Sequence, residues 1–295
     1  MADKYYTRLT NRALLVVGGE DRQAFLQGLV SNDVAKVAPD RAAWAAFLTP
    51  QGKFLHDLFI AARGDEYLID AEADRIEDFR KKLSMYKLRS KVTLAPAEGL
   101  GVFAAHGDTL GLPSEAGAAR GFGGGVAFVD PRLPRAGLRL YLPDWQPLAA
   151  AGFEEEPFAA WDERRIRLGL PDGSRDLPVE KAILLENGFD ELKGVDFNKG
   201  CYMGQELTAR TKHRGLVRKR LMPVRIDGTA PAPGTPVMLD GAEAGEMRSS
   251  AEGVGLALIR LEQFRAADGR QGAFTCGDAR LTPWKPDWAV FPEVE

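Results

Sequence analysis

The sequence predicts an α+β protein built in two parts, a larger region of mixed strands and helices followed by a small β-barrel. In the first two thirds of the chain, apolar strand-like runs alternate with segments of helical periodicity, which favours packed α+β layers. In the last third, short apolar runs recur between Pro- and Gly-rich turns, a spacing typical of a small barrel or sandwich. The length of 295 residues accommodates about two domains.

Each element of the larger region follows from its own pattern. Short uninterrupted apolar runs indicate buried strands, and apolar residues three and four apart indicate amphipathic helices. A Pro/Gly turn between two apolar runs indicates a hairpin. In chain order, these patterns predict a strand at residues 14–17, a helix from Phe25, a hairpin of residues 45–48 and 54–61, a strand at 67–70, a helix at 73–87, a strand at 138–142 and a helix at 161–168.

Two stretches divide the chain further. Residues 107–125 are rich in Gly, Ala and Ser, and we expect an exposed connection between two halves of the larger region there. After about Arg214 the sequence pattern changes to short apolar runs separated by turns, as expected for the barrel. We therefore predict one domain at residues 1–214 and a C-terminal β-barrel at residues 215–295.

Composition narrows the class of protein. A net charge of -3, from 39 basic and 42 acidic residues, argues against a surface built to coat nucleic acid. Two cysteines, Cys201 and Cys276, are too few for a disulfide framework, so we expect a reducing cytoplasm. Residues 1–10 lack the pattern of a signal peptide, and no apolar run reaches the roughly 20 residues that cross a bilayer. The sequence therefore predicts a cytoplasmic monomer without membrane association.

The histidines indicate no metal site. His56, His106 and His213 lack the i, i+4 spacing that places two imidazoles on one helix face. The sequence therefore predicts no zinc site made by protein ligands alone. A nucleophilic pair of Cys201 with His56 or His213 stays open, because a sequence does not show which residues meet in space.

The most informative stretch is residues 198–206, Asn-Lys-Gly-Cys-Tyr-Met-Gly-Gln-Glu. Gly200 and Gly204 flank a cysteine and an aromatic residue, and glycine permits a tight turn and a close approach of the backbone to a ligand. Lys199 beside Cys201 would favour the reactive thiolate. The competing interpretation is a strand-to-helix turn that contains a buried cysteine.

This stretch, with Arg210 downstream, closely resembles the signature of the YgfZ family, folate-binding proteins in the superfamily of the glycine-cleavage T-protein, an aminomethyltransferase. Similar segments occur elsewhere, so the resemblance covers nearly the whole chain. These segments are residues 25–33, 48–53, 86–92, 165–171 and 253–260.

The resemblance implies a folate-binding module of two related α+β halves around a central hole, closed by a small β-barrel. It also implies a role in making or maintaining iron-sulfur clusters in client enzymes, including enzymes that modify tRNA. The associated ligand would be tetrahydrofolate or a one-carbon or polyglutamyl derivative. Cys201 is the residue that the resemblance marks as functional.

The chain departs from the transferase branch at one position. T-proteins carry two adjacent aspartates, associated with folate activation, where this sequence has His56-Asp57. One carboxylate, Asp57, therefore remains as a candidate catalytic group. This departure favours the YgfZ family over a glycine-cleavage aminomethyltransferase.

The resemblance also suggests residues that bind folate. Glu186 occupies the position of the superfamily's pterin-binding glutamate, and a carboxylate can accept two hydrogen bonds from an aminopyrimidine edge. Tyr202 or Phe189 would stack on the rings, Arg89 and Arg210 would hold the glutamate tail or the loop, and Lys199 lies on the same loop as Tyr202. The competing interpretations are a core aromatic for Tyr202 and solvated side chains for the arginines.

Residues 212–220 form a basic run at the predicted domain boundary. Such a run can attract a polyglutamate tail or RNA, but it lacks the interleaved aromatic residues of single-strand binders. We interpret it as a solvated linker and expect no direct binding of nucleic acid.

Three functional hypotheses remain. The first is a thiol site that assists cluster repair by using folate. The second is a folate-binding scaffold whose partner performs the chemistry, and the third is a true aminomethyltransferase. Cys201 alone cannot hold an iron-sulfur cluster, because clusters are normally held by about four thiolates. Any contact with a cluster must therefore be transient or shared.

Overall fold

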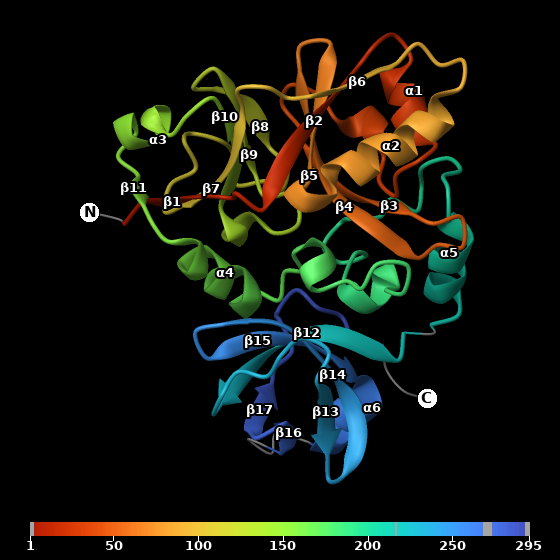
Figure 1. Cartoon of the computed structure of the whole chain (residues 1–295), viewed down its shortest axis with the longest axis vertical. Coiled ribbons are helices and arrows are strands. Elements are labelled where there is room, and N and C mark those ends of the chain that lie inside the picture. Colours follow the sequence, from red (N-terminus) through yellow and green to blue (C-terminus); the bar gives the residue numbers. More distant parts are fainter. Residues whose placement is uncertain (1–2, 216, 268–272, 293–295) are drawn as a thin grey trace. The chain divides into compact units, whose positions relative to one another are not determined.

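The computed structural model describes residues 3–215, 217–267 and 273–292. The chain forms two compact units, which are described separately here (Figure 1). The first unit consists of Met1–Pro50, Leu55–Phe158 and Leu192–Gln205, and the second of Gln51–Phe54, Ala159–Glu191 and Glu206–Glu295. The division into domains at residues 1–214 and 215–295 stays a prediction.

The first unit contains a five-stranded sheet with the strand order β3-β4-β5-β2-β6. Four of its strands contain the apolar runs that the sequence predicts, whereas β6 is short and mostly exposed, and α2 packs on β2. The elements are β2 (Arg12–Gly18), α1 (Arg22–Gln27), η1 (Val34–Lys36), β3 (Ala43–Leu48), β4 (Phe54–Arg63), β5 (Glu66–Glu72), η2 (Ala73–Arg75), α2 (Ile76–Lys87) and β6 (Thr93–Pro96).

A second, six-stranded sheet of this unit has the order β11-β1-β7-β10-β9-β8. The N-terminal strand β1 pairs antiparallel with β7, so the chain's first strand joins a sheet made of much later residues. The elements are β1 (Tyr5–Arg8), β7 (Gly101–His106), β8 (Ala119–Phe122), β9 (Gly125–Val129), η3 (Pro134–Ala136), β10 (Leu138–Leu142), α3 (Gln146–Ala150) and β11 (Glu154–Glu155).

The expectation that residues 107–125 form only an exposed connection is wrong for their last part. Strand β8 lies there and pairs with β9 as a hairpin. The glycines serve close packing, because a Cβ on Gly125 would lie 1.8 Å from the backbone oxygen of Tyr141. A tight hairpin and an exposed linker can both be rich in glycine, so glycine content alone does not distinguish them.

The second unit contains the predicted barrel, a closed structure of order β12-β15-β14-β13-β16-β17. Its interior is apolar and includes Cys276, which is 1% exposed. Helix α6 follows β15 (Figure 1). The barrel elements are β12 (Lys219–Asp227), β13 (Pro236–Leu239), β14 (Ala242–Ala251), β15 (Val254–Arg260), α6 (Leu261–Ala267), β16 (Phe274–Cys276) and β17 (Ala279–Pro283).

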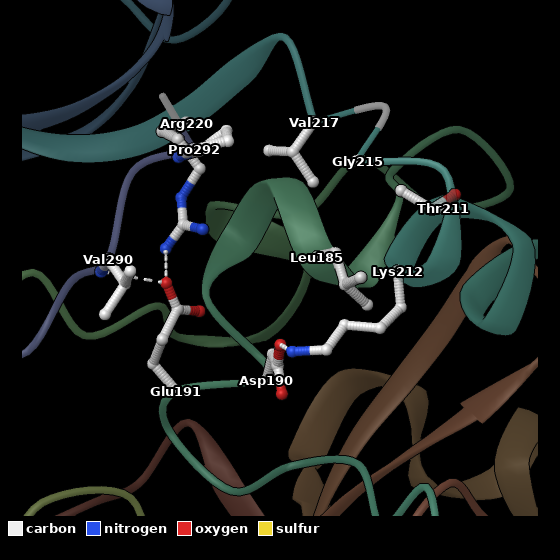
Figure 2. Close-up of a pocket in the computed structure, with 10 residues that line it drawn as sticks. All are labelled: Leu185, Asp190, Glu191, Thr211, Lys212, Gly215, Val217, Arg220, Val290 and Pro292. Carbon is white, nitrogen blue, oxygen red and sulfur yellow. Dashed lines mark hydrogen bonds and ion pairs between the residues drawn. The ribbon is translucent and has the colours of Figure 1, made fainter. Parts of the chain in front are cut away.

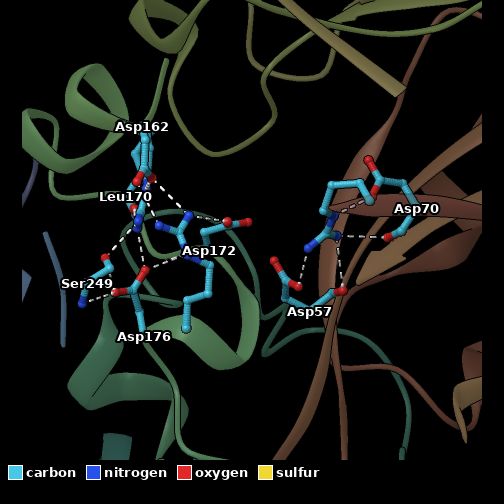
Figure 3. A network of polar contacts seen from close by, with 10 residues as sticks. Asp57, Asp70, Asp162, Leu170, Asp172, Asp176 and Ser249 are labelled. Atoms are coloured by element: carbon cyan, nitrogen blue, oxygen red, sulfur yellow. Dashed lines mark hydrogen bonds and ion pairs between the residues drawn. The ribbon is translucent and has the colours of Figure 1, made fainter. Parts of the chain in front are cut away.

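A buried ion network connects the residues before the barrel to it. Arg165 donates hydrogen bonds to Asp162 (2.7 Å) and to Ser249 Oγ on β14 (2.7 Å), and it also pairs with Asp176 (Figure 3). Arg175 adds contacts to Asp162 and to Asp172, so several carboxylates share two guanidinium groups. This network explains why residues 159–191 belong with the barrel. The remaining elements of the unit are α4 (Phe158–Arg167), η4 (Gly173–Arg175), η5 (Leu184–Asn187) and α5 (Gln205–His213).

In the part of the chain that the structure describes, every helix is too short or too polar to traverse a bilayer.

Candidate functional site

Two of the sequence segments that carry the family resemblance meet in the first unit. The residues that lead into and form the signature loop are held by the backbone of residues 28–32, directly after α1. Met203 N donates to Gly28 O (3.0 Å), and Asp196 N donates to Ser31 O (3.1 Å). The Ser31 hydroxyl in turn donates to Gly194 O (2.6 Å). Hydrogen bonds thus fix the signature loop and the residues before it against residues 28–32, which belong to a second segment of the resemblance.

Lys199 is the central anchor of this arrangement. Its Nζ donates to the backbone oxygens of Val30 (2.7 Å) and Asn32 (2.6 Å), and it lies 5.2 Å from the centre of the Tyr202 ring. Burial lowers the pKa of Lys199 to about 8, although the nearby carboxylates of Asp33 and Asp196 raise it. The ammonium therefore holds the loop in place by two carbonyl contacts.

Cys201 lies on the exposed side of this loop, whereas the ring of Tyr202 is buried. The alternative of a buried cysteine in this turn is therefore wrong. Gly204 has a φ of 80°, a left-handed conformation that favours glycine, directly before α5 begins at Gln205. The result is a free thiol presented on a loop whose neighbours are fixed.

Asp57 has a different environment, on β4 of the same unit. It is 1% exposed, and its carboxylate accepts a hydrogen bond from Arg12 Nη1 at 2.8 Å (Figure 3). Arg12 Nε also donates to Asp70 (2.6 Å), and Asp70 pairs with Arg139. Arg139 lies over the ring of Phe59, 3.8 Å from its centre. Asp57 is thus one member of a closed ion network.

His56 precedes Asp57 and is completely buried. Burial, with a smaller contribution from the charge of Arg75, lowers the pKa of His56 to about 4. Its ring packs near Phe79 (5.2 Å between centres), and Nε2 lies 3.2 Å from an oxygen of Asp78. The histidine is therefore neutral at pH 7 and belongs to the core, which argues against a nucleophilic pair with the exposed Cys201.

Glu186 lies in η5 of the second unit. Burial raises the pKa of its carboxyl group, while the cations Lys219, Lys53 and Arg248 lower it. Within the described residues its carboxylate makes no hydrogen bond. A half-buried carboxylate with free acceptor atoms fits the pterin edge of a folate, which offers two donors side by side.

The two predicted arginines are both exposed. Arg89 follows α2 in the first unit, and Arg210 lies on α5 in the second. Most of the basic run at residues 212–220 is also exposed, although Arg220 is buried and Leu216 lies outside the described residues. That Lys199, Tyr202, Arg89 and Arg210 contact a folate stays a prediction.

The structure brings Lys199, Cys201 and Tyr202 together on one loop, and it places Asp57 in an ion network. Sequence reasoning missed the network around Asp57, in which Arg12 binds Asp57 directly and Asp70 links Arg12 to Arg139. The available signal for Asp70 was a carboxylate inside a predicted buried strand, between the apolar residues Ile69 and Ala71. Among the described residues, no group of three or more His, Cys, Asp or Glu side chains could hold a metal ion.

The fold and its barrel define a class of protein. The structure is similar to aminomethyltransferase T of the glycine cleavage system from Bartonella henselae, with a TM-score of 0.72, 15% identity, and coverage of 96% of this chain and 85% of that one. Residues 218–291 match the C-terminal beta-barrel domain of CAF17. The chain therefore has the α+β fold of an aminomethyltransferase with a closed C-terminal barrel.

The sequence relatives identify the family within this class. The chain is 36% identical to the mitochondrial iron-sulfur cluster assembly factor IBA57 of Mus musculus, over 88% of this chain and 78% of that protein. It is 34% identical to the factor of Homo sapiens (95% and 84%) and 32% identical to the homolog of Coccidioides immitis (96% and 82%). The chain belongs to the IBA57 family of iron-sulfur cluster assembly factors.

These comparisons correct two expectations. The resemblance to YgfZ is confirmed for the wider superfamily of YgfZ, CAF17 and IBA57, but not for YgfZ in particular. The expectation of a cytoplasmic protein is wrong, because these relatives are named as mitochondrial factors. A scarcity of cysteines indicates a reducing compartment without saying which one.

Proposed function

We propose that the chain supports the assembly or repair of iron-sulfur clusters in client enzymes, including enzymes that modify tRNA, and that Cys201 is its functional thiol. The observation that carries this proposal is the exposed thiol on a loop anchored by Lys199. Membership of the IBA57 family supports the role in cluster assembly. Anchoring lowers the entropy lost when the thiolate contacts iron.

The cluster is the cargo of this reaction. One thiolate cannot hold it, because clusters are normally bound by about four cysteines. Cys201 would therefore contribute a single ligand, while a partner protein supplies the others. The chain's own residues keep the thiol exposed and oriented, and Cys276 takes no part because it is buried in the barrel.

The same proposal includes tetrahydrofolate, or a one-carbon or polyglutamyl derivative, as the ligand of the module. The support is Glu186, whose half-buried carboxylate has free acceptor atoms for a pterin. Bound folate would supply one-carbon chemistry. The chain's contribution at this point is to bind the ring edge and to fix its orientation.

Aminomethyl transfer is the alternative that the fold favours. Asp57 argues against it, because its carboxylate is buried and paired with Arg12 rather than turned toward a ligand. Incubation with an aminomethylated lipoyl carrier and tetrahydrofolate tests this alternative. Formation of methylene-tetrahydrofolate would establish it, and its absence would remove it.

Complementation tests the thiol directly. Cells that lack their own IBA57 family member would receive the full chain, Cys201→Ser or the loop control Met203→Leu, with matched protein levels. We expect Cys201→Ser to lose at least about tenfold in the activity of iron-sulfur enzymes, and Met203→Leu to retain it. Full rescue by Cys201→Ser would contradict a thiol-dependent role and would favour the scaffold hypothesis.

A further inference from the structure

A pocket of about 350 Å³ lies in the second unit, and its lining residues include neither Cys201 nor any candidate folate-binding residue (Figure 2). Its apolar wall includes Leu185, Val217 and Val290. This volume is at the small end of the range for ligand pockets and suits a single small ring with one polar substituent.

The charged residues of the pocket cancel one another. Lys212 pairs with Asp190, and Arg220 Nη2 donates to Glu191 Oε1 at 2.7 Å. Two positive and two negative groups leave no net charge at this wall. A charged ligand would lose its hydration without a matching counter-ion, so the pocket favours an uncharged one.

Glu191 and Arg220 leave hydrogen-bonding atoms unused. Glu191 Oε1 accepts from Arg220 and from Val290 N (3.1 Å), whereas Oε2 is buried and has no partner in the described chain. Arg220 is 3% exposed, and of its terminal nitrogens only Nη2 bonds another described residue. Figure 2 shows the free oxygen and the free terminal nitrogen turned to the same side, toward Leu185.

This pair is held in place before any ligand arrives. The guanidinium carbon of Arg220 lies 5.4 Å from the centre of the Phe291 ring. The backbone N–H of Val290 donates to the carboxylate of Glu191 and so fixes its orientation. Buried donors and acceptors without partners are rare in proteins and cost stability. Glu191 Oε2 is such an acceptor, so a ligand that donates to it removes that cost and can accept from the free terminal nitrogen of Arg220 at the same time.

We propose that this pocket binds a small uncharged ring compound through an amide edge, either a primary carboxamide or a lactam. The carbonyl oxygen would accept from Arg220, the N–H would donate to Glu191, and the ring would lie on Leu185 and Val217. Both kinds of amide present a donor and an acceptor side by side. A trans secondary amide, as in an extended peptide, does not.

Titration of the full chain with defined probes tests this assignment. We would follow the ¹³C-methyl NMR signals of Leu185 and Val217 during addition of benzamide, 2-pyridone, N-methylbenzamide and benzoate. Benzamide and 2-pyridone are expected to shift these signals and to bind at least about tenfold more tightly than the other two. Binding by only one of the two shows which amide source fits. No shift with either, or equal binding of benzoate or N-methylbenzamide, overturns the proposal.

A substitution that reverses the preference separates recognition from misfolding. In Glu191→Gln the free oxygen is replaced by an NH₂ donor, so residue 191 and Arg220 both offer donors to the ligand. The pocket also loses one negative charge and becomes positive. Benzoate is then expected to bind more tightly than benzamide. The control Glu252→Gln, at an exposed position, should still bind benzamide more tightly than benzoate. An unchanged order in Glu191→Gln would overturn the assignment, and neither result depends on Cys201 or folate.

Discussion

Asp57 and Glu186 are both carboxylates that the sequence marks as candidates, yet their surroundings differ. Asp57 is buried on β4 and accepts a hydrogen bond from Arg12, which is itself shared with Asp70. Glu186 is half-buried in η5, near cations that do not hydrogen-bond to it. A carboxylate whose acceptor atoms are used by a guanidinium stabilises the fold, whereas one with unused atoms is available to a ligand.

The comparison therefore separates stability from binding. Changes to the Asp57 region should lower the free energy of unfolding, and changes at Glu186 should lower affinity for a ligand. The same logic applies to the signature loop, where the hydrogen bonds of Lys199 go to backbone oxygens and the Cys201 thiol stays exposed.

The largest expected effect is at Asp70. Asp70→Asn removes the charge that Arg12 and Arg139 share, leaving buried guanidinium groups without adequate compensation. We expect the free energy of unfolding to fall by about 3–5 kcal/mol, measured by urea denaturation at pH 7. Glu77→Gln, which breaks an exposed pair with Arg80 on α2, should cost far less, because water screens that pair. Equal losses of stability in the two variants would contradict the claim that the buried ion network contributes more than an exposed ion pair.

Acid should act next on the same region, through His56. The folded pKa of about 4 lies below the ordinary 6.5, so the unfolded chain binds the proton more tightly between these values. Stability is fully present above pH 6.5 and falls as the pH drops to 4, by up to about 3 kcal/mol. Urea denaturation at several pH values measures this loss.

His56→Phe provides the matched control for the acid effect. The new ring would pack against Phe47 and Phe79 and carries no titrating group. Its stability should therefore depend less on pH between 6.5 and 4 than that of the wild type. Identical pH profiles for the two proteins would show that other groups cause the acid sensitivity.

The fold could be predicted where burial leaves a continuous apolar run. Strands β2, β4 and β5 show such runs, and each was expected. Strand β14 has the sequence Ala-Glu-Ala-Gly-Glu-Met-Arg-Ser-Ser-Ala, so its polar positions concealed it. Strand β8 was concealed by the glycines of its hairpin. The local sequence pattern thus identifies strands that are buried on both faces of a sheet better than it identifies strands whose position depends on pairing with a neighbour.

The candidate site could be predicted only in part, for a related reason. The resemblance located Cys201, but the anchor contacts of Lys199 join residues more than a hundred positions apart. Arg12 likewise reaches Asp57 and Asp70 across 45 and 58 positions. Motifs identify residues that act together in one segment, whereas ion networks depend on the tertiary fold. That no described residue hydrogen-bonds to the Glu186 carboxylate became visible only in the structure.

The smallest expected effect in free energy is at Glu186, and it concerns binding. Calorimetry with tetrahydrofolate under anaerobic conditions should show an affinity about tenfold weaker for Glu186→Gln, a loss of about 1.4 kcal/mol. The reason is that the substitution replaces one of the two acceptor oxygens of the carboxylate by an NH₂ donor. Since burial raises the pKa of Glu186, ionisation at pH 7 opposes folding, and the substitution should leave stability unchanged or higher. Asp57→Asn should show the opposite pattern, with lower stability and retained affinity in the folded fraction. If Asp57→Asn instead weakened folate binding as strongly as Glu186→Gln, the buried carboxylate would be part of the ligand site, and the separation of scaffold from site would fail.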